Sequence, residues 1–264
     1  MTELKIKILD KKHNTIAAGK NMNRLATLIY SSIYEEGDLI SIELNQCGLF
    51  CEVQLDEAMK PAILFISGDV LYFKIPFEEM RSALSPKAFH GSCHVITARI
   101  LEEWEVKIKR NLALNPYDGF LAPGIFPHAD ANVETRNEAV FAARNAIDGI
   151  YANHSHGKFP YGSWGINQQE DAEWKLEFGQ SVLIDELRLT LRADYPHDNY
   201  WKQAAVEFSD GSIEVIELSR LDEPQAFKFE PKTVSWLILK NLIKSNEISP
   251  FPALTQFEAI GHYI

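Results

Sequence analysis

The stretch QAAVEFSDGSIEVIEL (203–218) decides the fold class. Its two runs, 203–211 and 212–218, alternate apolar and polar residues, which is typical of strands with one buried face. The SDGS sequence at 209–212 places an Asp-Gly pair between them, and such a pair favours a tight hairpin turn. The stretch therefore predicts two antiparallel strands.

Similar short runs occupy most of the chain on both sides of this hairpin. They lie at 4–9, 39–44, 49–55, 62–67, 70–75, 93–101 and 104–112, and then at 173–178, 182–192, 226–230, 234–242 and 254–261. Two windows differ: NRLATLIYSSIY (23–34) has apolar residues at helical spacing, and NEAVFAARNAID (137–148) predicts a short helix at 137–144. Many short strands with turns between them predict an all-β protein of the sandwich or jelly-roll type.

The periodic pattern fails near the middle of the chain. Three prolines and two glycines fall between residues 113 and 136, and no strand or helix period is sustained there. We therefore predict two β-sandwich domains: 1–112, which we assign to no family, and 133–264, with 113–132 connecting them. The sequence shows no alternation of strands and helices and no phosphate-binding glycine loop. This argues against nucleotide binding by a Rossmann-type or P-loop motif.

The charge and the cysteine content limit which partners and which cellular compartment are expected. The net charge is −11 and the isoelectric point is about 5.2, which argues against nucleic acid and anionic membrane as main partners. No apolar run is long enough to cross a membrane, and the first residues show no signal peptide. With only Cys47, Cys51 and Cys93, we expect reduced thiols and a cytoplasmic protein.

The second half resembles the discoidin domains, also called coagulation-factor C-type domains, and the related bacterial carbohydrate-binding modules of the galactose-binding-like jelly roll. The resemblance is carried by a series of elements in the family's order: ARNAIDG (143–149), SWG (163–165), EWKLEFG (173–179), IDELRLTLR (184–192), VEFSDGS (206–212) and FEAIG (257–261). It covers about half of the chain. It implies a jelly roll whose end loops bind sugars.

The resemblance also implies a structural calcium ion beside the DG turn at 148–149. Calcium takes about 6–8 oxygen ligands, mostly carboxylates and carbonyls. Asp148 is the carboxylate that matches the family's element, Asn145 and Asn153 can offer carbonyl oxygens, and Glu258 lies in the matching terminal strand. The chain lacks the second acid and the threonine that often follow this turn in the family.

Two loops combine aromatic rings with polar side chains in the way that a sugar site needs. An aromatic ring covers the apolar face of a sugar, while His, Asn and Arg bond its hydroxyls. The sequence predicts such a surface on the loops 154–164 and 192–201. The residues are His154, His156, Tyr161, Trp164, Arg192, His197, Asn199 and Trp201. The alternative interpretation is that Trp164 packs at the rim of the sandwich and that the histidines are solvated loop residues.

Two other function classes stay open. A glycan-processing enzyme, a hydrolase or lyase, would use histidines and acids of these loops and of the segment before them as a metal or acid–base centre. These residues are His128, His154, His156, His197, Asp130, Glu134, Asp194 and Asp198. No nucleophile-elbow or zinc-protease motif supports it. A protein-interaction module would use the same loops against another chain. The leading hypothesis is non-catalytic carbohydrate binding, with a homo-oligomer left open. Trp174 and Trp236 are predicted core residues.

Overall fold

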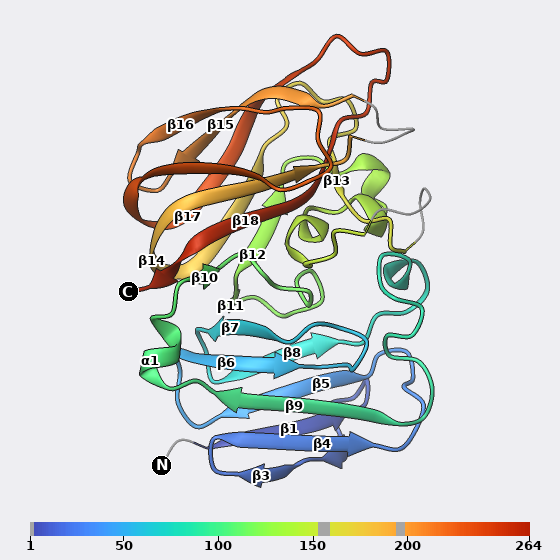
Figure 1. The fold of residues 1–264 in the computed structure, drawn as a ribbon. Helices are drawn as coiled ribbons and strands as arrows, with labels where there is room; N and C mark the ends of the chain where they lie inside the picture. Colours follow the sequence, from blue (N-terminus) through green and yellow to red (C-terminus); the bar gives the residue numbers. More distant parts are fainter. Residues whose placement is uncertain (1–2, 153–158, 194–198) are drawn as a thin grey trace.

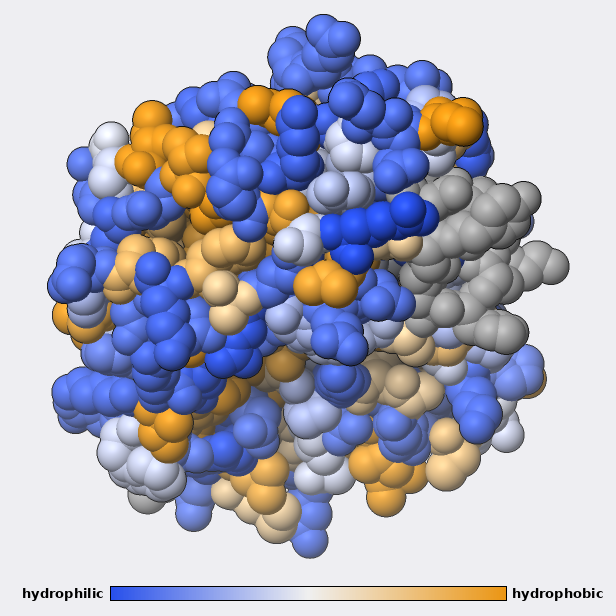
Figure 2. Space-filling model, turned by 45° about the horizontal axis from the view of Figure 1, so that its top comes forward, coloured by the Kyte–Doolittle hydropathy of each residue, from blue (hydrophilic) through white to orange (hydrophobic). Residues whose placement is uncertain are grey.

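The computed structural model describes residues 3–152, 159–193 and 199–264. Antiparallel strands dominate both halves and the helical segments are short, so the predicted all-β class is confirmed (Figure 1). No helix in the described part of the chain is long and apolar enough to cross a membrane. Figure 2 shows hydrophilic side chains over much of one face, with apolar ones gathered in several groups between them.

The first half is a sandwich of two sheets around one core. One sheet has the order β2-β1-β5-β8 and the other β11-β7-β6-β9-β4-β3, where β11 is Ile125–Phe126. The bounds are β1 (Leu4–Leu9), β2 (Thr15–Ala18), β3 (Lys20–Met22), β4 (Leu25–Tyr30), β5 (Leu39–Leu44), β6 (Leu49–Gln54), β7 (Ala62–Ile66), β8 (Val70–Lys74) and β9 (His94–Ile100). Alternation drives the packing: Leu4, Ile6 and Ile8 are buried, whereas Lys5 is exposed.

The second half is built on one strongly bent sheet with the order β10-β18-β14-β17-β15-β16. Its strands are β10 (Arg110–Asn111), β12 (His128–Ala131), β13 (Trp164–Gly165), β14 (Trp174–Leu191), β15 (Trp201–Phe208), β16 (Ile213–Glu217), β17 (Gln225–Lys244) and β18 (Ala253–Tyr263). β12 pairs with β14, and β13 pairs with β18. Register shifts along β14 bend the sheet around its core.

Three predicted elements differ in the structure. The window 23–34 holds β4 and not a helix, because Ala26, Leu28 and Tyr30 alternate inward while Ile29 is exposed. The window 104–112 holds one helical turn, α1 (Glu103–Val106), before β10, because Glu102 and Glu105 form a reciprocal cap.

The helix predicted at 137–144 is instead a series of 3₁₀ turns. These are η2 (Thr135–Asn137), η3 (Ala139–Phe141) and η4 (Ala143–Ile147), and a further turn, η1 (Glu78–Arg81), lies in the first half. Extended backbone at Glu138 and Ala142 separates the three turns, so no continuous helix forms. All five residues of η4 are buried, so the segment packs into the protein although its backbone is not α-helical.

The segment 113–132 contributes strands to both halves. β11 (Ile125–Phe126) pairs with β7 of the first half, and the adjoining β12 pairs with β14 of the second. Asp118 ties the segment together, because its carboxylate accepts hydrogen bonds from the backbone of Ala129 and from the ring of His128. The halves therefore meet through a hydrogen-bonded segment.

Candidate functional site

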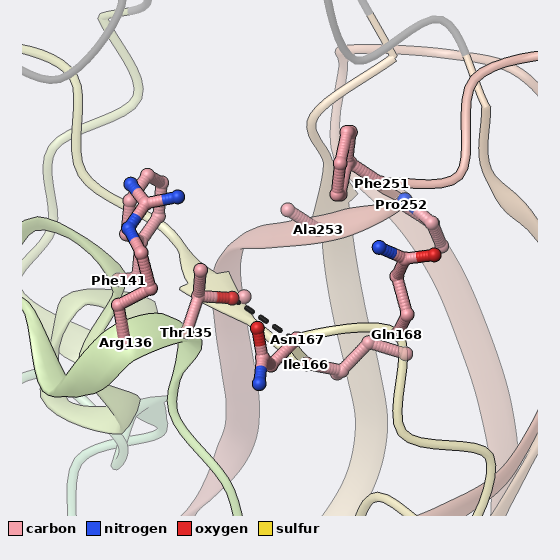
Figure 3. A pocket seen from close by; sticks show the side chains of 10 residues that line it. Thr135, Arg136, Phe141, Ile166, Asn167, Gln168, Phe251, Pro252 and Ala253 are labelled. Atoms are coloured by element: carbon pink, nitrogen blue, oxygen red, sulfur yellow. Dashed lines mark hydrogen bonds between the residues drawn. The ribbon is translucent and has the colours of Figure 1, made fainter.

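A shallow pocket opens at one end of the second half (Figure 3). Three segments meet there: the η2–η3 turns, the chain after β13 and the chain entering β18. The lining residues are Thr135, Arg136, Phe141, Gly165, Ile166, Asn167, Gln168, Phe251, Pro252 and Ala253. Its volume is about 80 Å³, far below the roughly 300–1,000 Å³ of pockets that enclose a small ligand. Only one face or edge of a ligand fits into it.

Phe251 supplies an aromatic surface at the rim of this pocket. Its side chain is 45% exposed, and Figure 3 shows the ring standing above Ala253, across the opening from Arg136 and Phe141. The local sequence SPFP (249–252) explains this placement. Pro250 and Pro252 have no backbone N–H, so the chain joins the ladder only at Ala253 and the ring stays outside the sheet.

Arg136 forms the opposite wall and is held in place. Its Nε and Nη2 atoms donate to the two carboxylate oxygens of Glu138 at 2.6 and 2.8 Å. The guanidinium carbon lies 5.3 Å from the centre of the Phe141 ring. A bidentate ion pair and a ring contact fix the direction of the guanidinium. Its remaining N–H groups can therefore donate to a ligand at a defined position.

Two turns beside the pocket have backbone strain, and a hydrogen bond joins them. Arg136 and Asn137 have φ values of 54° and 53°, and Asn167 and Gln168 have values of 48° and 61°. Residues other than glycine rarely adopt this left-handed region, and such strain clusters at ligand sites. The hydroxyl of Thr135 accepts a hydrogen bond of 2.9 Å from the backbone N–H of Asn167, drawn dashed in Figure 3. This bond holds the two turns in one geometry.

The predicted aromatic ligand residues are corrected by their burial. Tyr161 and Trp164 are 0% exposed and Trp201 is 1% exposed, so no ring face is available for stacking on a ligand. Trp164 packs on Trp201 at 6.0 Å, and its indole N–H donates to the carbonyl of Val133. Trp164 and Trp201 are the first residues of strands β13 and β15, and both belong to the main core of this half. Tyr161 packs in a smaller cluster with Phe141.

Arg192 and Asn199 are also buried and support the pocket from behind. The guanidinium of Arg192 lies 3.6 Å from the centre of the Tyr161 ring, and that ring packs edge-on against Phe141 in the pocket wall. The side-chain amide of Asn199 donates to the carbonyls of Glu247 (3.3 Å) and Ser249 (2.6 Å). Asn199 therefore anchors the segment that leads to Phe251.

Several predicted residues lie outside the described part of the chain. These are His154, His156 and His197 of the ligand set, Asn153 of the metal set, and Asp194 and Asp198 of the catalytic alternative. The pocket residues that the sequence analysis missed are Phe251, Arg136, Asn167 and Gln168. A sequence signal for the first existed, because an aromatic residue between two prolines cannot lie inside a strand.

Of the described residues named for calcium, Asn145 and Asp148 lie together around the side-chain amide of Gln256, and Glu258 is bonded elsewhere. Glu258 accepts a 2.7 Å hydrogen bond from the hydroxyl of Tyr151, and its other oxygen lies 3.9 Å from the Arg188 guanidinium. Asp148 instead accepts a 2.7 Å hydrogen bond from the side-chain amide of Gln256. Burial raises the pKa of Asp148 to about 7. The donor set therefore does not fit the ion, because an amide N–H₂ group points at the carboxylate that would hold it.

The acids and histidine named for catalysis have structural roles where they are described. Asp118 is bonded to the ring of His128, which raises the pKa of that histidine. Glu134 accepts a hydrogen bond from the backbone N–H of Ala143, and Asp130 from that of Ala131. Each group stabilises a turn or a strand end, and no described carboxyl group lines the pocket.

Comparisons with known proteins were made by family, by sequence and by structure. No family model and no curated protein matches the chain. A chitosan-binding module from a chitosanase/glucanase of Paenibacillus sp. IK-5 is 19% identical and covers 58% of this chain and 99% of its own, with a TM-score of 0.40. A fucose-binding module of Streptococcus pneumoniae is 12% identical, covers 58% and 96%, and has a TM-score of 0.43.

A third solved structure is the family 32 carbohydrate-binding module of NanJ from C. perfringens, in complex with galactose. It is 13% identical and covers 50% of this chain and 91% of its own, with a TM-score of 0.38. These neighbours belong to the class of carbohydrate-binding modules that the sequence motifs resemble.

Proposed function

We propose that the pocket beside Phe251 binds a carbohydrate without changing it. The observation that carries the proposal is an exposed aromatic ring facing a fixed guanidinium across a small depression, with Asn167 and Gln168 on the rim. A sugar presents an apolar C–H face to a ring and hydroxyls to amides and guanidinium groups. The proposed ligand surface thus differs in its residues from the one predicted from sequence, but not in its chemistry.

The shape of the site supports recognition of one sugar face and not enclosure of a whole ligand. One stacked ring and a few exchanged hydrogen bonds leave little net free energy, so we expect a Kd of about 0.1–1 mM for a single sugar. Held side chains and strained turns reduce the ordering cost of binding, because the walls are already in place. Repetition of the module in an oligomer would raise the apparent affinity.

The absence of a carboxyl group among the described lining residues supports a non-catalytic role. Glycoside cleavage uses two carboxyl groups about 5–10 Å apart, one on each side of the scissile bond. Of the acids nearest in sequence to the lining residues, Glu138 pairs with Arg136 and Glu134 caps η4, and Glu170 does not line the pocket. The pocket therefore offers contact surface and hydrogen bonds, but no described acid–base pair.

A glycan array followed by calorimetric titration of any hit tests the proposal. Phe251→Ala should weaken binding about tenfold, because ring stacking adds about 0.5–1.5 kcal/mol to the lost apolar contact. Trp104→Ala is the matched control, since Trp104 is also an exposed ring (65%) but lies on α1. Equal affinity of the Phe251→Ala protein and the wild type would place the site elsewhere. Release of products from the glycan would instead show an enzyme.

A further inference from the structure

The side-chain amide of Gln256 lies at the centre of a cage of oxygen atoms. Its nitrogen Nε2 is 2.7 Å from the carbonyl oxygen of Asn145, 2.7 Å from Oδ1 of Asp148 and 2.6 Å from the carbonyl oxygen of Thr255. All four residues are buried, with exposed fractions of at most 4%. The cage joins the η4 turn to strand β18, two segments more than a hundred residues apart in the sequence.

The network fixes the orientation of this amide. The oxygen Oε1 of Gln256 accepts a 2.8 Å hydrogen bond from the backbone N–H of Gly149. Turning the amide over would place Oε1 against three acceptor oxygens and the N–H₂ group against an N–H donor. With Asp148 ionised, the turned amide would form no hydrogen bond with the three oxygens or with the Gly149 N–H, so the nitrogen faces the cage.

The oxygen cage has the composition of a cation site. One carboxylate and two backbone carbonyls, gathered from an irregular turn and a strand, are the ligands that hard cations take in proteins. An amide nitrogen carries two hydrogens, yet three oxygens surround it at hydrogen-bond distance. The partly positive N–H₂ group thus meets more acceptor oxygens than it has hydrogens to donate.

We infer that Gln256 takes the place of a metal ion at this junction, so that the turn at 143–150 is fastened to β18 without calcium. The argument is independent of the proposed sugar site. A bound ion would have to displace the N–H₂ group from the cage, and the Gly149 N–H would then lose its acceptor in a buried setting. The chain would thereby depart from the calcium site that its sequence resemblance implies.

The wild-type protein provides the first test. Its Tm should be the same in excess chelator and in millimolar calcium, and calorimetric titration with calcium chloride should give no binding heat. An ion that binds only the folded state raises its stability by mass action, so a structural ion would be visible in this comparison. A fall of Tm in chelator that calcium reverses would overturn the inference.

The variant Gln256→Glu provides the second test, because it exchanges the amide for a carboxylate of the same shape. Two carboxylates and two carbonyls would then face one another, so we expect a lower Tm in chelator and a rise of several degrees on adding calcium. Gln256→Glu combined with Asp148→Asn should lose the calcium response. Gln46→Glu, at an exposed position between β5 and β6, controls for the added charge.

The variant is purified in calcium and then treated with chelator, so that folding does not depend on an empty site. A variant indifferent to calcium would overturn the claim that the cage suits a cation. A variant stabilised by calcium, together with a wild type that does not respond, supports it. The wild-type result decides the calcium question even if the variant does not fold.

Discussion

Trp174 and Trp236 lie on neighbouring strands, but Trp174 is a core residue and Trp236 is only half-buried. Both lie on the paired strands β14 and β17, Trp174 opposite Leu239 and Trp236 opposite Glu177. Trp174 is 0% exposed, packs on Phe257 and donates its indole N–H to the carbonyl of Ala143. The prediction that it is a core residue is confirmed. For Trp236 the prediction is wrong, because its ring is half-buried beside Lys175 on the other face.

Replacing each tryptophan by alanine should therefore give unequal losses of stability. Trp174→Ala removes a fully enclosed ring and its hydrogen bond, and should lower the free energy of unfolding by about 3–5 kcal/mol. Trp236→Ala removes a ring that already contacts solvent and should cost less than half as much. Urea unfolding of both variants measures the difference. Equal losses would contradict the assignment of the two faces.

Asn199 was predicted as a sugar ligand, and the structure instead makes it a positioning residue for Phe251. It bonds the carbonyls of Glu247 and Ser249 and accepts a 2.7 Å hydrogen bond from the hydroxyl of Ser245. Asn199→Ala should cost about 1–3 kcal/mol, because the buried hydroxyl of Ser245 loses its acceptor and two carbonyls lose this donor. Hydrogen exchange should accelerate in residues 245–251. Exposed Asn246→Ala is the control, and unchanged exchange in Asn199→Ala would refute this role.

None of the described residues predicted as sugar ligands lines the proposed pocket, although Trp164 directly precedes its lining residue Gly165. Tyr161, Trp164 and Trp201 have the composition of a sugar site, yet composition does not reveal which side of a strand a ring faces. Residues next to a strand end can be drawn into the core, as Trp201 is. Phe251 lies elsewhere in the sequence, and only the fold brings it to Arg136.

At the scale of elements, alternation predicted strands well and failed where both faces of a strand are apolar. In β4, Leu25 and Ile29 are apolar residues on the exposed face, and together with the inward-facing apolar residues they imitate a helical repeat. The long strands β14 and β17 were each predicted as two. Gly179, at a φ of +75°, lets β14 bend without ending. In the sequence, a glycine at such a bend resembles a turn between two separate strands.

The ion pair between His128 and Asp118 should make the junction segment sensitive to pH. A hydrogen bond to Asp118 raises the pKa of His128 above its ordinary value of about 6.5. Asp130 and Glu177 also raise it. The folded state therefore binds the proton more tightly, and this stability is complete below about pH 6.5 and is lost as pH rises through the raised pKa.

The expected size of the effect is below about 1 kcal/mol, because the His128 side chain is 43% exposed and solvent screens the pair. His128→Gln can keep a hydrogen bond to Asp118 at every pH and has no such titration. The stability of the wild type relative to this variant should fall between pH 6 and pH 8, as measured by urea unfolding. A constant difference would mean that the pair does not contribute to holding the segment.

At the scale of the whole molecule, aromatic side chains join the two halves. Phe50 of β6 packs on Tyr263 of β18 at 4.4 Å, and Phe65 of β7 lies 6.4 Å from Phe126. The ammonium of Lys60 also donates to the carbonyl of Gly149 at 2.5 Å. Each contact joins a residue of the first sandwich to the second half or to the connecting segment. The two halves should therefore unfold together in one transition.

Gly179 offers a direct test of this contact, because it meets the rings at the boundary. A Cβ atom there would overlap a ring carbon of Phe126 and lie 2.9 Å from one of Phe65. Gly211 is the matched control, with a φ of +83° and no atom within 4 Å of the added Cβ. Both alanine variants carry a backbone cost of about 1–2 kcal/mol for the left-handed conformation.

Gly179→Ala should lose a further 1–3 kcal/mol or so, because it overpacks the boundary. The excess over Gly211→Ala isolates the contact between the halves from backbone strain, since the strain is common to both variants. Near-ultraviolet circular dichroism during urea unfolding follows the aromatic packing of both halves. If the boundary couples them, the Gly179→Ala transition moves to lower urea as a single step. Equal losses in the two variants would instead mean that the rings move aside freely and that each half is stable without the other's contact.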